Sequence, residues 1–175
     1  MMPLAGDFAG LPEANNPPIL NGGRMSFFDK VRKTFSEGRA ELVAQVGRFK
    51  NKKFMEGTVA VCAYIATASK GADSGEKQKM MGFIKNSDEL KVFDTSEVIA
   101  FFKKLEDGHQ FDADIGKGEM MKYILALKGD EGAAQLALRV GVAVAKSDGD
   151  FDNAEKQAVK EICMALGFDP NDYQQ

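Results

Sequence analysis

The chain has 175 residues, of which 44% are hydrophobic and 28% are charged, and its formal net charge is −3. This composition supplies enough apolar material for one core, so we expect a single folded domain. So small a net charge excludes a chain that is basic throughout, as a nucleic-acid binder is, or uniformly acidic. The longest uncharged stretch, residues 57–69, is far shorter than the roughly 20 apolar residues that span a bilayer.

The first 24 residues are rich in proline, glycine and asparagine, and they lack the basic start and apolar core of a secretory signal. We expect a disordered extension over residues 1–24 and one helical domain over residues 25–175. Cys62 and Cys163 stand alone, without a second thiol at CxxC spacing. This usage fits a reducing cytoplasm, which is the expected location, and it excludes a zinc site built from thiolates.

Hydrophobic residues recur at helical spacing along most of the domain. Residues 28–46 predict an amphipathic helix or helix pair, interrupted at Gly38. Residues 58–68 and 132–145 are apolar on almost every side, which predicts two central helices surrounded by others. Four further helices are predicted over residues 76–84, 95–105, 115–127 and 153–166. No segment alternates with the period of a strand, so we expect an all-α bundle of about seven helices.

An internal repeat is the most informative pattern in the sequence. Residues 66–78 resemble residues 144–157, and each segment has a glycine where a helix must end, followed by Asp-x-x-Glu. Asp73 with Glu76, and Asp152 with Glu155, can each form a capping box on the next helix. Two related αα-hairpins are therefore predicted, packed together as a bundle. The last helix is expected to end at Gly167.

Several blocks of the sequence resemble the bacterial TerB family. They include VGRFKNKKFM at residues 46–55, ELKVFDT at residues 89–95 and SDGDFD at residues 147–152. The resemblance extends from Met25 to about Asp172. It implies an all-helical fold, a place in a tellurite-resistance and stress-response system, and association with TerC-type membrane proteins and TerD-type calcium-binding proteins. It also implies metal binding through acidic residues in the loops between helices.

The second acidic loop is the better candidate for such a metal site. Its aspartates alternate as Asp-x-Asp-x-Asp, and carboxylate oxygens are the ligands that hard divalent cations such as Ca²⁺ prefer. A glutamate on the first turn of the following helix can turn back toward the loop. In the first loop, Lys70 stands where the family has an acidic residue, which disfavours a cation there. The predicted metal ligands are Asp148, Asp150, Asp152 and Glu155.

Two interpretations of this loop remain open. The spacing is not that of an EF-hand, because position 6 would be Asn153 and position 12 would be Val159. In one interpretation, Asp152 and Glu155 only cap the last helix, which is worth about 1 kcal/mol and needs no ligand. In the other, the cap and a cation site coexist. Carboxylates before residue 115, at positions 112 and 114, are further possible contributors.

Charge is distributed unevenly along the chain. Residues 25–56 hold eight basic and four acidic side chains, a balance of +4, whereas residues 146–175 hold three basic and seven acidic ones, a balance of −4. The basic part, with its phenylalanines, suits anionic lipid headgroups at the inner membrane face or an acidic partner surface. A solvated polar face is the favoured alternative to membrane contact. No nucleic-acid recognition motif accompanies the charge.

Catalytic patterns are absent from the sequence. His109 is the sole histidine, and we interpret it as a surface residue in an acidic loop over residues 106–108. Cys62 and Cys163 lie in apolar runs, which predicts buried, neutral thiols. The paired methionines are interpreted as core residues; they are Met80, Met81, Met120 and Met121. We therefore expect a binding module and not an enzyme, with thiol-dependent detoxification of the tellurite oxyanion as the alternative.

Overall fold

A computed structural model describes residues 38, 40–69, 82, 85–86, 90–146 and 151–173 of the chain. No strand occurs among these residues, which confirms the predicted all-α class. Residues 40–46 are helical, as expected for the end of the first predicted helix. The elements are α2 (Lys52–Ala66), α4 (Thr95–Phe111), α5 (Ala113–Leu125), α6 (Glu131–Ala145), α7 (Asn153–Leu166) and a 3₁₀ turn, η2 (Pro170–Asp172).

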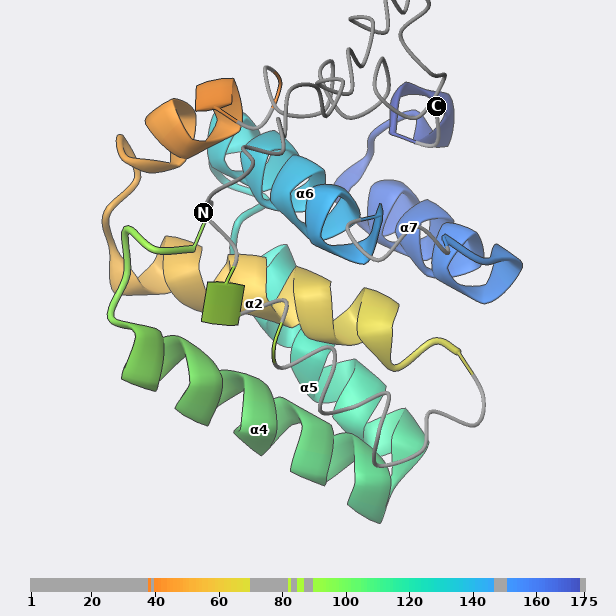
Figure 1. Ribbon diagram of the computed structural model, residues 1–175. Helices are drawn as coiled ribbons and strands as arrows, with labels where there is room; N and C mark the ends of the chain where they lie inside the picture. The colour runs from red at the N-terminus through yellow and green to blue at the C-terminus, as the bar shows by residue number, and fades with distance from the viewer. Residues whose placement is uncertain are drawn as a thin grey trace, which may run out of the picture.

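Helices α2 and α6 form the centre of the bundle, as the sequence predicted. Their side chains are buried on almost every side, and Figure 1 shows α2 between α4 on one side and α6 on the other. The two central helices approach closely at Gly141, where an added Cβ would lie 2.4 Å from Cγ1 of Val61. The two central helices are thus in direct contact in their C-terminal halves.

Helix α2 begins before its predicted start at residue 58. The side chain of Asn51 accepts a hydrogen bond from the backbone N–H of Phe54 at 2.8 Å and so caps the helix. The Phe54 ring is buried, and it contacts Phe49 and Phe93 with ring centroids 5.3 and 6.1 Å away. Burial of Phe54 therefore stabilises a first turn that helical periodicity alone did not indicate.

Helix α4 continues to Phe111, so the prediction that it ends at residue 105, before an acidic loop, is wrong. Gly116 of α5 packs against the backbone of α4, where an added Cβ would lie 2.3 Å from Cα of His109. This close helix–helix contact holds residues 106–111 in helical form. Asp112 ends α4 and also caps α5, because its carboxylate accepts from the N–H groups of Asp114 and Ile115.

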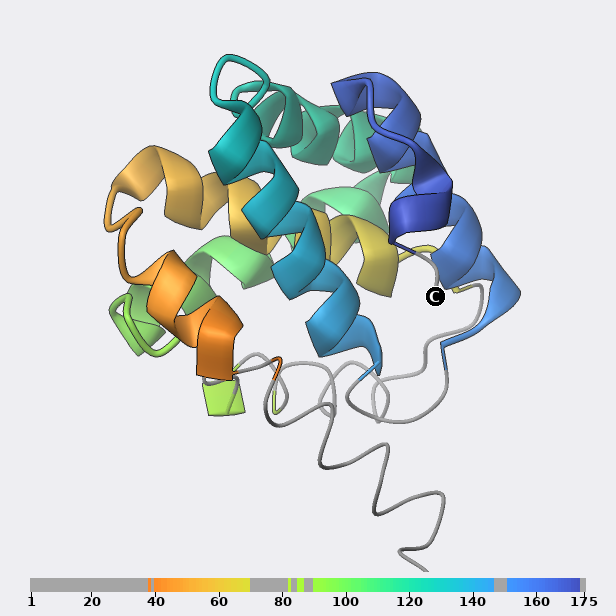
Figure 2. The same cartoon turned by 90° about the horizontal axis from the view of Figure 1, so that it is seen from above.

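Helix α7 has the bounds that the sequence predicted. It ends at Gly167, whose φ of 85° is left-handed and costs glycine little. The chain then returns along α7 as η2, as seen in Figure 2, and the rings of Phe168 and Tyr173 lie 6.1 Å apart. The predicted helix over residues 76–84 falls almost wholly outside the described residues, as does the capping box of Asp73 and Glu76.

Candidate functional site

The end of the second repeat loop forms the cap of α7. The Asp152 carboxylate accepts from the backbone N–H of Glu155 at 2.8 Å, and the Glu155 carboxylate accepts from the backbone N–H of Asp152 at 2.9 Å. This is the reciprocal capping box that the Asp-x-x-Glu spacing predicted. Glu155 is buried, with 5% of its surface exposed, so the box is held against the core.

A hydrogen bond joins this cap to the first repeat. The Ser69 hydroxyl, just beyond the end of α2, donates to the Asp152 carboxylate at 2.6 Å. This bond and the backbone N–H of Glu155 lower the pKa of Asp152, because both favour the charged form. The ends of the two repeat loops therefore meet at Asp152. Sequence reasoning missed Ser69, and the only sequence signal for it was its place beside the first loop.

Two lysines approach the second loop. Lys146 and Lys156 both lie over the ring of Phe151, with their Nζ atoms 5.4 and 5.9 Å from its centroid. Burial lowers the pKa of Lys146, and the charge of Lys156 lowers it further. The carboxylate-rich second loop thus has two lysine side chains beside Phe151, where the described part of the loop begins.

The described residues contain only part of the predicted ligand set. Asp152 and Glu155 are brought together in the cap, whereas Asp148 and Asp150 lie outside the described residues. Asp112, a further possible contributor, caps α5 at the α4–α5 turn. Within the part of the chain that the structure describes, no three His, Cys, Asp or Glu side chains cluster in a way that could hold a metal ion. The cap is confirmed, and the cation site remains a prediction.

The two thiols lie in the core, and the histidine lies within a helix. Cys62 and Cys163 are 3% and 0% exposed, as predicted. Burial raises the pKa of the Cys163 thiol to about 11, and nearby aspartates add to the effect, so the reactive thiolate is disfavoured. His109 is half-buried within α4, which corrects its expected place in a surface loop. Met120 is fully buried in the core, as expected.

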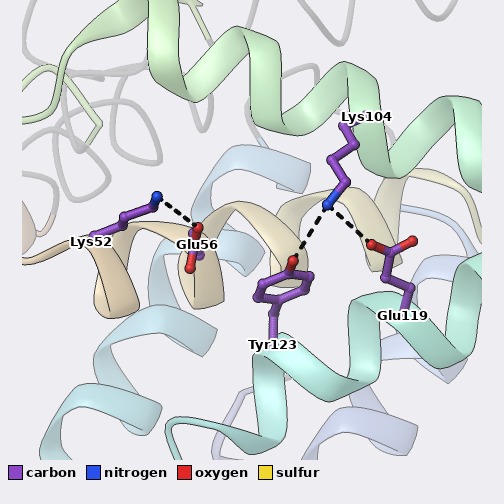
Figure 3. A network of polar contacts seen from close by, with 5 residues as sticks. All are labelled: Lys52, Glu56, Lys104, Glu119 and Tyr123. Carbon is purple, nitrogen blue, oxygen red and sulfur yellow. Dashed lines mark hydrogen bonds and ion pairs between the residues drawn. The ribbon is translucent and has the colours of Figure 1, made fainter.

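Other polar contacts on the bundle tie helices together. The Tyr64 hydroxyl of α2 donates to Glu161 of α7 at 2.7 Å. On the outer face, Lys104 of α4 lies 3.3 Å from a Glu119 carboxylate oxygen and donates to the Tyr123 hydroxyl at 3.5 Å (Figure 3). The bond to Glu119 is the main reason that the pKa of Lys104 is raised. These contacts are structural links between elements, because each charged group has a partner.

No helix in the described ranges is long and apolar enough to cross a bilayer. The described residues thus define an all-helical bundle whose candidate site consists of carboxylate oxygens at a helix cap, with its two cysteines buried in the core. The fold and the site therefore define the class of protein: an all-helical bundle with a carboxylate-based candidate site.

Comparison with known proteins identifies the family. The family model described as "Tellurite resistance protein TerB" matches residues 55–175. A protein of Alcaligenes sp named "Tellurium resistance protein TerB" is 68% identical over 119 residues, which cover 68% of this chain and 98% of that protein. No solved structure matches the chain. The chain belongs to the TerB family of tellurite-resistance proteins.

Proposed function

We propose that this chain acts in tellurite resistance as a divalent-cation-responsive binding module. The ligands are Asp148, Asp150, Asp152 and Glu155. The observation that supports the proposal best is the bond from Ser69 to Asp152, because it makes one candidate ligand a contact between the two repeats. An ion held there would act on both hairpins and not on one loop alone.

The donor set suits a hard divalent cation. All four ligands are carboxylates, and an ionised carboxylate offers about four lone-pair sites, so an oxygen that accepts one hydrogen bond can also coordinate an ion. Four carboxylates with the nearby Lys146 and Lys156 leave a net charge of −2. That charge matches one divalent ion, and Ca²⁺ is the first candidate because it accepts irregular oxygen cages.

The response would reach partners through the charged surfaces of the bundle. An ion that orders the loop before α7 also orders the carboxylates on that loop, which a partner would contact. Together with the family resemblance, this supports TerC-type membrane proteins and TerD-type calcium-binding proteins as partners. Such contacts would hold the protein at the inner face of the membrane. The basic part around residues 48–53 would face lipid headgroups or an acidic partner.

Metal titration of the purified chain tests the proposal. Ca²⁺, Mg²⁺, Mn²⁺ and Zn²⁺ are added in turn while thermal melting and residue-resolved NMR shifts are recorded. We expect one of these ions to raise the melting temperature, because it binds the folded form selectively, and to shift the signals of residues 147–155 first. Unchanged melting and unchanged loop signals with all four ions would leave Asp152 and Glu155 as a helix cap alone.

A matched pair of variants separates ligands from caps. Asp148→Asn with Asp150→Asn removes two candidate ligands and keeps the Asp152 cap, so it should abolish the ion response with little change in ion-free stability. Asp94→Asn is the control, because Asp94 caps α4 by accepting from the N–H groups of Ser96 and Glu97. It should lower stability slightly and leave the ion response intact.

The alternative function is thiol-dependent detoxification of tellurite. Its residues would be Cys62 and Cys163, and their burial together with the raised pKa of Cys163 disfavours it. Cys62→Ser with Cys163→Ser is the test, with tellurite consumption by purified protein as the readout. Consumption that is lost in the double variant would support the thiol reaction, and equal or absent consumption in both forms would dismiss it.

A further inference from the structure

The turn between α4 and α5 carries two exposed apolar side chains. Phe111 is 90% exposed and Ile115 is 64% exposed, whereas Phe102 and Ile124 of the same helices are buried. We call residues 107–115 the hairpin tip. Exposed apolar side chains that gather at one turn are a candidate contact with another molecule.

The hairpin tip is acidic: it holds Asp107, Asp112 and Asp114 and no lysine or arginine. Residues 105–116 contain four carboxylates and no lysine or arginine. One of the four, Glu106, is buried, and the other three, Asp107, Asp112 and Asp114, are exposed around the apolar pair. An anionic lipid surface would repel this tip, whereas a basic protein surface would attract it.

The opposite end of the same molecule offers such a surface. Residues 48–53 contain four basic side chains and no acidic one, and Arg48, Lys50 and Lys53 are exposed there. Beside them, Phe49 and Phe93 remain partly exposed where they flank the buried Phe54. We call residues 48–53 with Phe93 the basic end. It combines positive charge with aromatic surface, as the tip combines negative charge with apolar surface.

The two surfaces cannot meet within one molecule. Phe93 packs on Phe54, so α4 starts at the N-terminal end of α2, and the basic end lies there too. The hairpin tip lies toward the C-terminal end of α2, where Thr67 contacts Met120 of α5, as Figure 1 shows. Helix α2 has 15 residues, so it separates these ends by about 22 Å.

We propose that the hairpin tip of one copy docks on the basic end of a second copy. Phe111 and Ile115 contact the aromatic surface of Phe49 and Phe93, and the tip aspartates face Lys50 and Lys53. Each joined copy still presents a tip at one side and a basic end at the other, so the contact is heterologous and can repeat. The tip is small, so the association is expected to be weak and concentration-dependent.

Sedimentation of the full chain over a wide range of concentrations tests the proposal. The weight-average mass should rise with concentration at low salt and fall toward that of the monomer at high salt, because salt screens the facing charges. Phe111→Ser with Ile115→Ser should weaken self-association at least tenfold. Met164→Ser is the matched control, because Met164 is 68% exposed on α7, outside both surfaces, and it should leave association unchanged. Circular dichroism verifies that each variant is folded.

A mixing experiment tests the head-to-tail geometry. The tip variant keeps its basic end, and a second variant with Lys50→Glu and Lys53→Glu keeps its tip. Each alone should remain monomeric, whereas an equimolar mixture should form a one-to-one complex that grows no further. Lys160→Glu, an exposed change of charge on α7, should behave like the wild type.

Three outcomes would overturn the proposal. The wild type could sediment as a monomer at every concentration, or the two variants could fail to combine. Alternatively, both tip and control variants could associate as the wild type does. A tip variant that loses flotation with zwitterionic vesicles, while the wild type stays monomeric, would assign the tip to a membrane instead.

Discussion

Replacing Gly116 by alanine tests the close contact that shapes the α4–α5 hairpin. An added Cβ would lie 2.3, 2.6 and 2.7 Å from Cα, N and Cβ of His109. Two of these are backbone atoms, so a change of side-chain rotamer cannot relieve the overlap, and the helices must move apart. Overpacking of this kind costs about 1–3 kcal/mol, and the rigid backbone places Gly116→Ala near the upper end of that range.

The control lies two residues further along the same helix. Gly118 is exposed, and an added Cβ there meets nothing within 4 Å. Gly118→Ala should therefore stabilise the protein by about 0.5–1 kcal/mol, the ordinary gain of alanine over glycine within a helix. Subtracting the same gain from the overlap at Gly116 leaves a net loss of about 2 kcal/mol for Gly116→Ala.

Urea unfolding followed by circular dichroism measures both free energies of unfolding. A loss of about 2 kcal/mol corresponds to a fall in melting temperature of roughly 4–8 °C for a domain of this size. Gly116→Ala should show that fall, and Gly118→Ala should show a small rise. If the two variants proved equally stable, the backbone contact at His109 would not exist in solution.

Three further predictions concern the core. Gly141→Ala should destabilise the protein by about 1–3 kcal/mol. Adding Val61→Ala should recover part of this loss, because the added Cβ would lie 2.4 Å from the Val61 side chain. A double-mutant cycle of urea unfolding measures the coupling between the two positions. Burial and the bond to Glu161 raise the pKa of Tyr64 above 10. The contribution of Tyr64 to stability is therefore complete below pH 10 and is lost progressively as the pH rises from 10 through the raised pKa. Tyr64→Phe should flatten stability profiles measured at alkaline pH. Finally, the Cys163 thiol, with its pKa raised to about 11, should resist alkylation at neutral pH until the protein unfolds, and rapid labelling of native protein would contradict its burial.

Elements with strong local signals could be predicted from the sequence. Helix α7 is the clearest example, because Asp152 and Glu155 specify its start and Gly167 specifies its end. The two central helices could likewise be predicted from the periodicity of their apolar residues alone. The family could be predicted from sequence blocks, since the comparison with TerB proteins confirmed it.

Features that depend on contacts distant in sequence could not be predicted. The end of α4 is set by Gly116 of the next helix, which lies beyond any local signal at residues 106–108. The link from Ser69 to Asp152 spans 83 residues, and a repeat indicates similar hairpins without showing which atoms meet. The exposure of Phe111 could not be predicted either, because a phenylalanine at helical spacing is more often buried.

The position of Asp152 implies that the proposed ion binding would be coupled to the stability of the fold. Its carboxylate caps α7 and accepts from Ser69, so removing it destabilises the fold whether or not an ion binds. Loss of ion response in an Asp152 variant would therefore prove nothing about ligation, and the test depends on Asp148 and Asp150. An ion held by all three would tighten contacts that already join the repeats. At a hundred times its Kd such an ion adds about 2.7 kcal/mol, more than the cap itself contributes.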